Sequence, residues 1–353
     1  MNDQRSTMRV GIIGTGWGAR VQVPAFRAAG LDVAAIAGRA PEKTRGTAAR
    51  LGVVPFDSGE ALIERAAIDL VSIVSPPATH LPYAARALER GLHVLCEKPT
   101  ALNASEAREM VARAAAHPDR LALIDHELRF LPAWREAKQA LERIGTIRYA
   151  EVRYSSPSRH DPKRAWSWWS DAEQHGGIWG AVGSHYVDAI RYLVGEIEQV
   201  QAVLQTFVTT RPSGEGPRPV TSDDFAAVHL RIAGGATAAM TFSVVAAVDE
   251  PTSLTLVGDT GAYRLVRDRL LFAPPGGEWT EVVASAGAGA EGDTAGGAFG
   301  TATIHLARAL RAWSEGDRDA LAPAATFADG LRQQQVLDAA RRSHSNNGAW
   351  ELV

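Results

Sequence analysis

The chain of 353 residues has a single cysteine, Cys96, which excludes an intramolecular disulfide framework. It also has little net charge, −3 at pH 7, so electrostatics give no reason to expect a nucleic acid or an anionic membrane as partner. No apolar run reaches the roughly 18–20 residues that a membrane span needs, and residues 1–8 lack the apolar core of a signal peptide. These absences predict a soluble, cytoplasmic protein with no membrane or nucleic-acid partner.

The residues that are present are typical of a globular protein, with 46% hydrophobic and 22% charged residues. Between residues 8 and 125, short apolar runs alternate with helical stretches, and this alternation predicts a parallel sheet covered on both faces. The strands are expected at 10–14, 33–37, 70–75, 93–96 and 121–125, and the helices at 19–29, 41–51, 82–90 and 105–116.

After residue 130 the pattern changes to longer strand-like runs, and turns at Gly234-Gly235 and Asp259–Gly261 predict antiparallel hairpins. The sequence therefore predicts an α/β protein in which a second, α+β domain has a large open, mostly antiparallel sheet. We place the domains at 1–126 and 127–353. Segments 211–219 and 284–300 are expected to be surface loops, with a linker or a lid as the alternative. Further strands are expected at 147–155, 200–209, 225–232, 236–245 and 254–257, and further helices at 133–144, 178–194, 303–313 and 326–343.

A glycine-rich loop follows the first predicted strand. The run Gly14-Thr15-Gly16-Trp17-Gly18-Ala19 fits G-x-G-x-x-G/A, in which one glycine makes the turn and the next lets the backbone approach a pyrophosphate. The helix that follows offers its positive end to phosphates. Its position between a strand and a helix predicts a dinucleotide site, and a tight turn without ligand is the alternative.

The end of the second predicted strand indicates which dinucleotide is preferred. An NAD-binding loop has an acidic residue about 20 residues after the glycines, whereas this chain has Ala37-Gly38-Arg39 there. A guanidinium suits a 2′-phosphate, so we predict NADP, with NAD as the second choice. The alternative is that Arg39 is a solvated loop residue.

Several motifs in order, spanning nearly the whole chain, resemble those of the glucose–fructose oxidoreductase/inositol dehydrogenase (Gfo/Idh/MocA) family. The motifs that carry the resemblance are Gly14–Ala19, Ser75–His80, Glu97-Lys98-Pro99, Arg129–Pro132, Gly176-Gly177, Gly183–Asp188, Asp329-Gly330 and Leu337–Ser343.

This resemblance implies NAD(P)-dependent hydride transfer on a sugar, cyclitol or related polyol, by a homodimer or homotetramer formed through the open sheet. It implies that Lys98 contacts the reacting oxygen and that His185 is the acid/base residue; no metal is implied. The chemistry agrees, because hydride transfer leaves charge on oxygen and needs a cation and a proton donor. The resemblance places Ser75, Pro76, Pro77, His80, Glu97 and Lys98 at the cofactor, where Lys98 would also bond the ribose. The candidate substrate residues are Lys98, Arg129, Trp166, Trp168, Trp169, Ser184, His185 and Asp188.

Two departures from the family pattern leave alternatives open. The aspartate that many members have four residues before the histidine is Ala181 here, and the usual tryptophan–arginine pair is Trp168-Trp169. His185 as a buried structural histidine and Asp188 as a helix anchor are therefore alternatives to functional roles.

The tryptophans at 166, 168 and 169 suit sugar rings or, equally, pin a loop to the core. Arg159, His160 and Lys163 nearby would bind an acidic group or lie in solvent.

Two rival functions stay open. The first is a non-catalytic dinucleotide-binding regulator, which Ala181 keeps open. The second is a reductase of a non-sugar substrate, such as an imine or a linear-tetrapyrrole double bond.

Overall fold

The computed structural model describes residues 7–284 and 296–353. The contacts group the chain into two compact units, and each is described separately. Over the described residues, unit 1 contains 7–131 and 296–331, and unit 2 contains 132–284 and 332–353. This grouping differs from the expected single boundary after residue 126, because the segment up to residue 331 packs with the N-terminal residues.

Unit 1 is built on a seven-stranded sheet in the order β17-β6-β5-β4-β1-β2-β3. All neighbouring strands pair in parallel except β17 with β6. The short edge strand β3 and the helix after it were not predicted, because Val-Pro-Phe is too short a run to indicate a strand. The strands are β1 (Arg9–Ile13), β2 (Asp32–Ala37), β3 (Val54–Phe56), β4 (Leu70–Ile73), β5 (His93–Cys96), β6 (Ala122–Ile124) and β17 (Ala325–Thr326).

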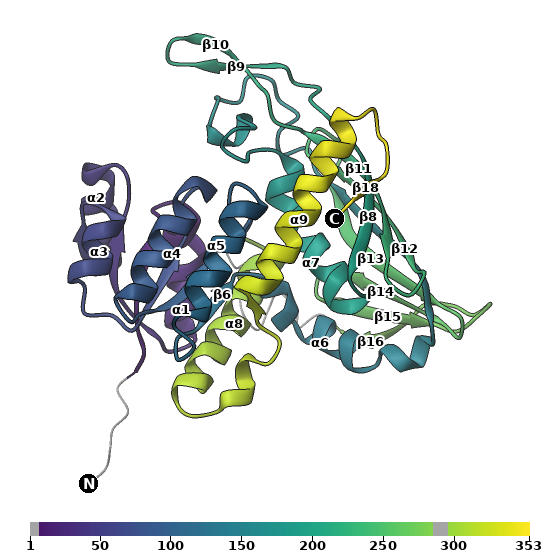
Figure 1. Ribbon diagram of the computed structural model, residues 1–353, viewed down its shortest axis with the longest axis horizontal. Coiled ribbons are helices and arrows are strands. Elements are labelled where there is room, and N and C mark those ends of the chain that lie inside the picture. Colours follow the sequence, from purple (N-terminus) through teal and green to yellow (C-terminus); the bar gives the residue numbers. More distant parts are fainter. Residues whose placement is uncertain (1–6, 285–295) are drawn as a thin grey trace. The chain divides into compact units, whose positions relative to one another are not determined.

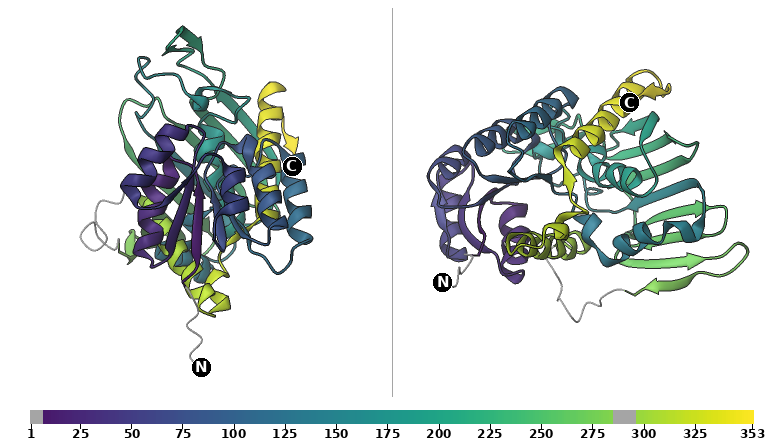
Figure 2. Two further views of the ribbon diagram at one scale, coloured as in Figure 1. Left: turned by 90° about the vertical axis from the view of Figure 1, so that its left-hand side faces the viewer. Right: turned by 60° about the horizontal axis from the view of Figure 1, so that its bottom comes forward.

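Helices cover both faces of this sheet, as the left-hand view of Figure 2 shows. Side chains of β1 alternate between two apolar clusters: Val10 and Ile12 pack with α1 and α8, whereas Ile13 packs with α3, α4 and α5. This two-sided burial explains why the strands are continuous apolar runs and confirms the predicted fold. The helices are α1 (Val23–Ala28), α2 (Pro41–Leu51), α3 (Gly59–Arg65), α4 (His80–Glu89), α5 (Ala104–Ala115) and α8 (Ala298–Ser314), with short turns at η1 (Gly18–Gln22), η2 (Pro77–Thr79), η3 (Glu127–Phe130) and η7 (Arg318–Leu321).

Unit 2 contains a nine-stranded sheet in the order β16-β15-β14-β13-β7-β12-β11-β8-β18. Among the described strands of this nine-stranded sheet, only β12 and β7 pair in parallel. The hairpin turn between β11 and β12 has Gly234 and Gly235 at φ +86° and +92°, which confirms the predicted antiparallel connection. The strands are β7 (Ile147–Ser155), β8 (Ile197–Gln205), β11 (Phe225–Ile232), β12 (Thr237–Ser243), β13 (Glu250–Gly258), β14 (Ala262–Val266), β15 (Arg269–Ala273), β16 (Thr280–Val283) and β18 (Glu351–Leu352).

Helices α6 (Pro132–Gln139), α7 (Ser184–Leu193) and α9 (Phe327–Ser345) lie over one face of this sheet (Figures 1 and 2). Three short turns belong to the same unit: η4 (Leu141–Ile144), η5 (Trp168–Ser170) and η6 (Trp179–Gly183). On the opposite face, a hollow of about 840 Å³ is lined by β7, β12, β13 and β14 side chains, including Glu151, Arg153 and Thr241. The sheet is therefore open on that side in the part of the chain described.

The prediction that 211–219 is a loop was wrong. These residues belong to a hairpin of β9 (Thr210–Ser213) and β10 (Gly216–Pro219). Trp166 holds the hairpin, because its backbone N–H donates to Pro212 O and its indole Nε1 to Pro219 O. The other expected loop, 284–300, falls mostly outside the described residues, which resume with a turn at 296 and the start of α8.

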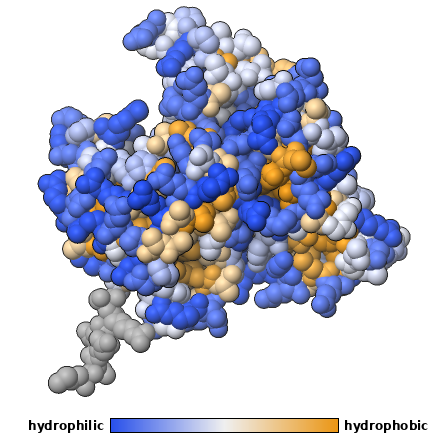
Figure 3. Space-filling model, in the orientation of Figure 1, coloured by the Kyte–Doolittle hydropathy of each residue, from blue (hydrophilic) through white to orange (hydrophobic). Residues whose placement is uncertain are grey.

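In the portion of the chain that the structure describes, no helix has the length and apolar character of a membrane span. Hydrophilic residues cover most of the face seen in Figure 3.

Candidate functional site

The glycine loop joins β1 to the helical turn η1, and each glycine has a different environment. Gly14 has φ +151°, and a Cβ there would lie 2.3 Å from Val74 O, so the turn accepts no side chain. A Cβ on Gly18 would lie 2.7 Å from Ile12 Cγ2, so this residue lets the helix approach the strand. Gly16 has no atom within 4 Å of its Cβ position. The open side of the loop is therefore at Gly16, where a phosphate group would fit against the backbone and the helix N-terminus.

The loop after β2 lies beside the glycine loop. A Cβ on Gly38 would lie 2.7 Å from Thr15 Cγ2, so the two loops touch. Arg39 is exposed and has no ion pair with any described residue. In contrast, Arg45 pairs with Glu42 at 3.2 Å and with Asp57 at 3.5 Å. Arg39 is thus the arginine of this region whose charge is available to an anionic ligand.

The segment after β4 is organised by a buried histidine. His80 is fully buried; its Nε2 lies 2.8 Å from Ser75 O, and its Nδ1 lies 3.1 Å from Pro99 O and 3.2 Å from Thr100 O. Burial lowers the pKa of His80. Because all three neighbours are backbone carbonyls, His80 ties the loop after β4 to the loop after β5. These contacts give His80 a positioning role, and its place beside a cofactor stays a prediction. Ser75, Pro76 and Pro77 form the loop itself.

Glu97 and Lys98 follow β5, and the structure adds residues that the sequence reasoning missed. Gln22 Nε2 donates to Asp125 Oδ2 at 2.8 Å and to Glu97 Oε1 at 3.4 Å. Burial raises the pKa of Glu97, which the neighbouring Lys98 partly offsets, and raises the pKa of Asp125 and Glu127 well above the ordinary range. The carboxyl ends of β5 and β6 thus carry three carboxyl groups beside one lysine.

In unit 2, the glycines before α7 permit close packing. A Cβ on Gly176 would lie 2.2 Å from Trp169 O, and one on Gly183 would lie 2.4 Å from the Trp179 ring. The helix they introduce carries the predicted residues Ser184, His185 and Asp188, which are 0%, 5% and 2% exposed. The predicted substrate residues of α7 are therefore almost fully buried.

A partly buried acid that sequence reasoning missed, Asp223, bonds to the first residue of η6, the helical turn before α7. Asp223 Oδ2 accepts a hydrogen bond of 2.7 Å from the backbone N–H of Trp179. Burial raises the pKa of Asp223 to about 6, although that N–H and Arg341 favour the charged form. Asp223 stands before β11, far from α7 in sequence, so no local signal indicated it.

The three tryptophans of the aromatic segment have different surroundings. The Arg218 guanidinium lies 3.4 Å from the centre of the Trp166 ring, and the Arg159 guanidinium lies 3.7 Å from that of Trp169. Trp168 is 40% exposed. The rings of Trp166 and Trp169 are thus each covered by an arginine, and Trp168 is the most exposed of the three tryptophans.

Arg159 lies between two other arginines, and its pKa is lowered to about 9 by burial, Arg164 and Arg211. His160 Nδ1 lies 2.9 Å from Val245 O, and Lys163 is exposed.

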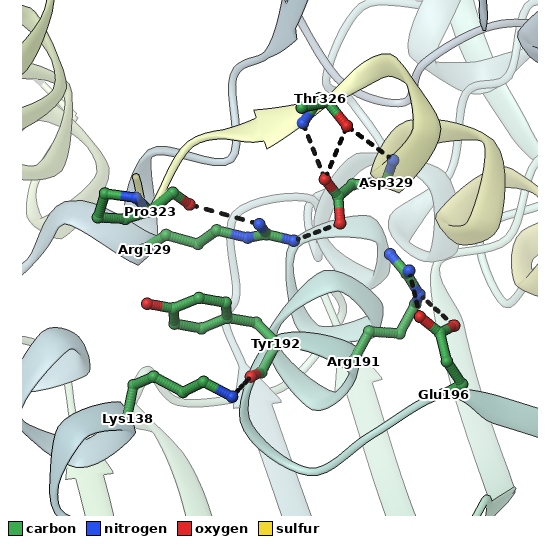
Figure 4. Close-up of polar contacts among 8 residues, drawn as sticks. All are labelled: Arg129, Lys138, Arg191, Tyr192, Glu196, Pro323, Thr326 and Asp329. Carbon is green, nitrogen blue, oxygen red and sulfur yellow. Dashed lines mark hydrogen bonds and ion pairs between the residues drawn. The ribbon is translucent and has the colours of Figure 1, made fainter. Parts of the chain in front are cut away.

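Arg129, which the resemblance placed at the substrate, is a structural residue of unit 1. Its guanidinium donates to Pro323 O at 3.4 Å and to Asp329 Oδ1 at 3.3 Å (Figure 4). Asp329 Oδ2 accepts from the backbone N–H of Thr326, the last residue of β17. Arg129 is 6% exposed, and its place at a substrate stays a prediction. Figure 4 also shows two contacts within unit 2, from Lys138 to Tyr192 O and between Arg191 and Glu196.

No group of three or more acidic, histidine or cysteine side chains that could hold a metal occurs among residues 7–284 and 296–353. The residues present do fit a dinucleotide, since the open side at Gly16 and the unpaired charge of Arg39 lie on touching loops. Fold and glycine loop together define a dinucleotide-dependent oxidoreductase.

Comparison with known protein families agrees with this class. Residues 8–124 match the oxidoreductase family with an NAD-binding Rossmann fold, and residues 134–264 match the GFO/IDH/MocA C-terminal domain. The chain belongs to the GFO/IDH/MocA oxidoreductase family.

Three known proteins illustrate the relationship. Human glucose-fructose oxidoreductase domain-containing protein 2 is 31% identical, covering 98% of this chain and 93% of its own. Levoglucosan dehydrogenase in complex with NADH and levoglucosan is 26% identical, with a TM-score of 0.87 over 99% of both chains. The WlbA dehydrogenase from Bordetella pertussis in complex with NADH and UDP-GlcNAcA, at 22% identity, shares the fold with a TM-score of 0.76 over 99% of both chains.

Proposed function

We propose that this protein is an NADP-preferring dehydrogenase or reductase that acts on a carbohydrate-like hydroxyl or carbonyl group. One observation carries the proposal. The glycine loop follows β1, and Lys98 follows β5 two strands away in the same parallel sheet. Since ligands of such sheets bind at the carboxyl ends of the strands, a dinucleotide on the loop and a cation for the reacting oxygen share one edge.

The residues proposed to hold the dinucleotide surround the first two strands. Gly14–Ala19 would hold the pyrophosphate, with Gly16 giving the closest approach. Gly38 and Arg39 would hold the adenosine ribose, and the absence of an ion pair between Arg39 and any described residue supports a 2′-phosphate there. NAD is the second choice, and levoglucosan dehydrogenase has been solved with NADH.

When bound, a nicotinamide supplies the hydride acceptor or donor. Lys98 would stabilise the charge that develops on the substrate oxygen, because an ammonium placed at an alkoxide lowers the barrier. We propose His185 as the proton-exchanging residue of unit 2, since an imidazole titrates near neutral pH. Trp168, the most exposed of the three, is the tryptophan proposed to stack on a sugar ring.

Turnover tests the proposal. Purified protein is mixed with NADPH or NADP and a panel of sugars, lactones, polyols and levoglucosan, and absorbance of the reduced nicotinamide is followed. Lys98→Met should lower kcat/KM by about 10²- to 10³-fold, the scale of one lost stabilising group, with little change in NADPH affinity. The control Lys138→Met should behave as wild type, because that ammonium bonds to Tyr192 O within unit 2. Equal losses in the two variants would contradict the role of Lys98.

A second candidate is a non-catalytic dinucleotide-binding protein. Ala181 favours it, because an alanine cannot orient or charge the imidazole of His185. This candidate predicts NADPH binding without turnover of any compound in the panel. A substrate found only among imines or tetrapyrroles would instead support the reductase of a non-sugar substrate.

We also propose that the open face of the unit 2 sheet joins copies of the chain into a homodimer or homotetramer. Tyr149 on β7 and Val203 on β8 are large apolar side chains that are 42% and 43% exposed. Sedimentation velocity of wild type and Tyr149→Glu tests this, because a charge on the joined face should shift the protein toward monomer. A monomeric wild type would refute it.

A further inference from the structure

Three carboxyl groups gather at the carboxyl ends of β5 and β6, where few charges are expected. Asp125 and Glu127 are 1% and 3% exposed, and Glu97 is partly exposed. Three buried negative charges this close would repel one another strongly and would each lose hydration. The single lysine beside them, Lys98, cannot neutralise all three.

Gln22 fixes the relation between two of these carboxyls. Its Oε1 accepts a hydrogen bond of 2.6 Å from Ser72 Oγ, so the amide nitrogen must point to the other side. There Nε2 donates to an oxygen of Asp125 at 2.8 Å and to one of Glu97 at 3.4 Å. Because one nitrogen serves both, the two oxygens lie no more than about 6 Å apart, which is close enough for one carboxyl to suppress ionisation of the other.

We propose that Asp125 is a positioning residue for the reaction proposed above: it stays protonated at neutral pH, so that the Asp125–Glu97 pair presents a single negative charge to Lys98. The effect of Asp125 on Lys98 rests on the proposed function. The proton held by Asp125 does not, because it depends only on groups within unit 1.

Burial assigns the proton to Asp125 and the charge to Glu97. Asp125 is enclosed, and its Oδ1 has no hydrogen-bond partner among the described residues, whereas Glu97 is partly exposed and precedes Lys98. The titratable groups that act on the pair include Lys98, Glu127 and the buried thiol of Cys96. The buried His126 stands next to Asp125 in the chain. The ammonium of Lys98 favours ionisation of the more accessible carboxyl.

The charge on the pair determines how Lys98 is held. One carboxylate beside the ammonium of Lys98 gives a pair with no net charge, which opposes negative charge on a substrate oxygen less than two carboxylates would. A doubly charged pair would bind the ammonium more tightly and oppose negative charge developing on the substrate. A neutral pair would leave the ammonium without its carboxylate.

Infrared spectroscopy measures the held proton without any substrate. At pH 8, at which Asp223 with a pKa of about 6 is ionised, the full-length protein should show the C=O stretch of a protonated carboxylic acid. Part of this band should shift when aspartate is labelled with 13C at the side-chain carboxyl, and the shifting part should vanish in Asp125→Asn. Absence of any aspartate-dependent acid band in wild type would overturn the inference, and this measurement needs no variant that folds.

Kinetics test the consequence for Lys98. Asp125→Asn keeps a neutral group of the same shape and should retain most of kcat/KM, whereas Asp125→Leu should lose at least about tenfold, the scale of one hydrogen bond to a charged group. Glu97→Gln should lose a similar factor and shift the pH profile of kcat, because it removes the single charge. Asp119→Asn is the matched surface control, since Asp119 pairs only with the neighbouring Arg120 among the described residues.

The opposite order, with Asp125→Asn much worse than Glu97→Gln, would place the charge on Asp125 and refute the assignment. An acid band without turnover would refute the proposed function and leave the held proton intact. Turnover without an acid band would refute the held proton and leave the proposed function intact.

Discussion

Charge reversal at Arg39 is the sharpest test of the cofactor preference. Arg39 is exposed and makes no ion pair within the described chain, so Arg39→Asp should leave the fold intact. The variant loses one charge-assisted contact to a 2′-phosphate, about 1.5–3 kcal/mol, and adds a repulsion of about 1 kcal/mol in water. Because solvent screens an exposed site, we take about 2–3 kcal/mol, which corresponds to about a 30- to 150-fold weaker Kd for NADPH.

Tryptophan fluorescence reports this binding. Trp17 stands in the glycine loop, and its ring packs against the backbone near Gly296, where a Cβ would lie 2.8 Å from Cη2. Titration with NADPH and NADH should show the loss for NADPH only, since an aspartate suits the ribose hydroxyls of NADH. Arg45→Ala is the matched control and should change Kd less than about threefold, because Glu42 and Asp57 already engage that guanidinium. Equal weakening of NADH and NADPH in Arg39→Asp would refute the reasoning.

Two further predictions concern the glycine loop and the helix before His185. Gly16→Ala should leave the unfolding temperature unchanged but weaken NADPH binding, because its Cβ would lie in open space where a phosphate is expected; Gly18→Ala should instead lower the unfolding temperature, because its Cβ would lie 2.7 Å from Ile12. For Asp223, a folded pKa of about 6 above the usual 3.8 means that the native state binds the extra proton between these values. Stability should therefore fall as pH rises from about 4 to 6, by up to about 3 kcal/mol, and urea unfolding of Asp223→Asn should show a flatter profile.

Local sequence signals predicted unit 1 well, because each β–α step leaves its own signature. Apolar runs and helix-stopping residues gave α2 and β5 with their observed bounds. The hairpin of β9 and β10 was missed for a physical reason: it carries three prolines and depends on Trp166, about 50 residues earlier, for a backbone and an indole hydrogen bond. A strand that depends on a distant side chain does not need the alternation of apolar and polar residues from which strands are predicted.

The same distinction separates the predicted site residues from the missed ones. The glycine loop, Arg39 and Lys98 were predicted because strand ends and loop chemistry are local features. His80 and Arg129 were predicted from their motifs, but the sequence did not indicate their partners, which are backbone carbonyls and an acid distant in sequence.

Gln22 and Asp125 were not predicted as site residues. Asp125 stands directly after β6, and ligands of parallel sheets bind at the carboxyl ends of the strands, so its position was a signal that could have indicated it. What the sequence could not supply is that Gln22, 103 residues earlier, reaches it. Of the residues at this edge of the sheet, Lys98 is the one that a sequence motif indicates. If the Asp125–Glu97 pair sets its charge, substitutions one strand away will change the chemistry of Lys98 without touching the motif.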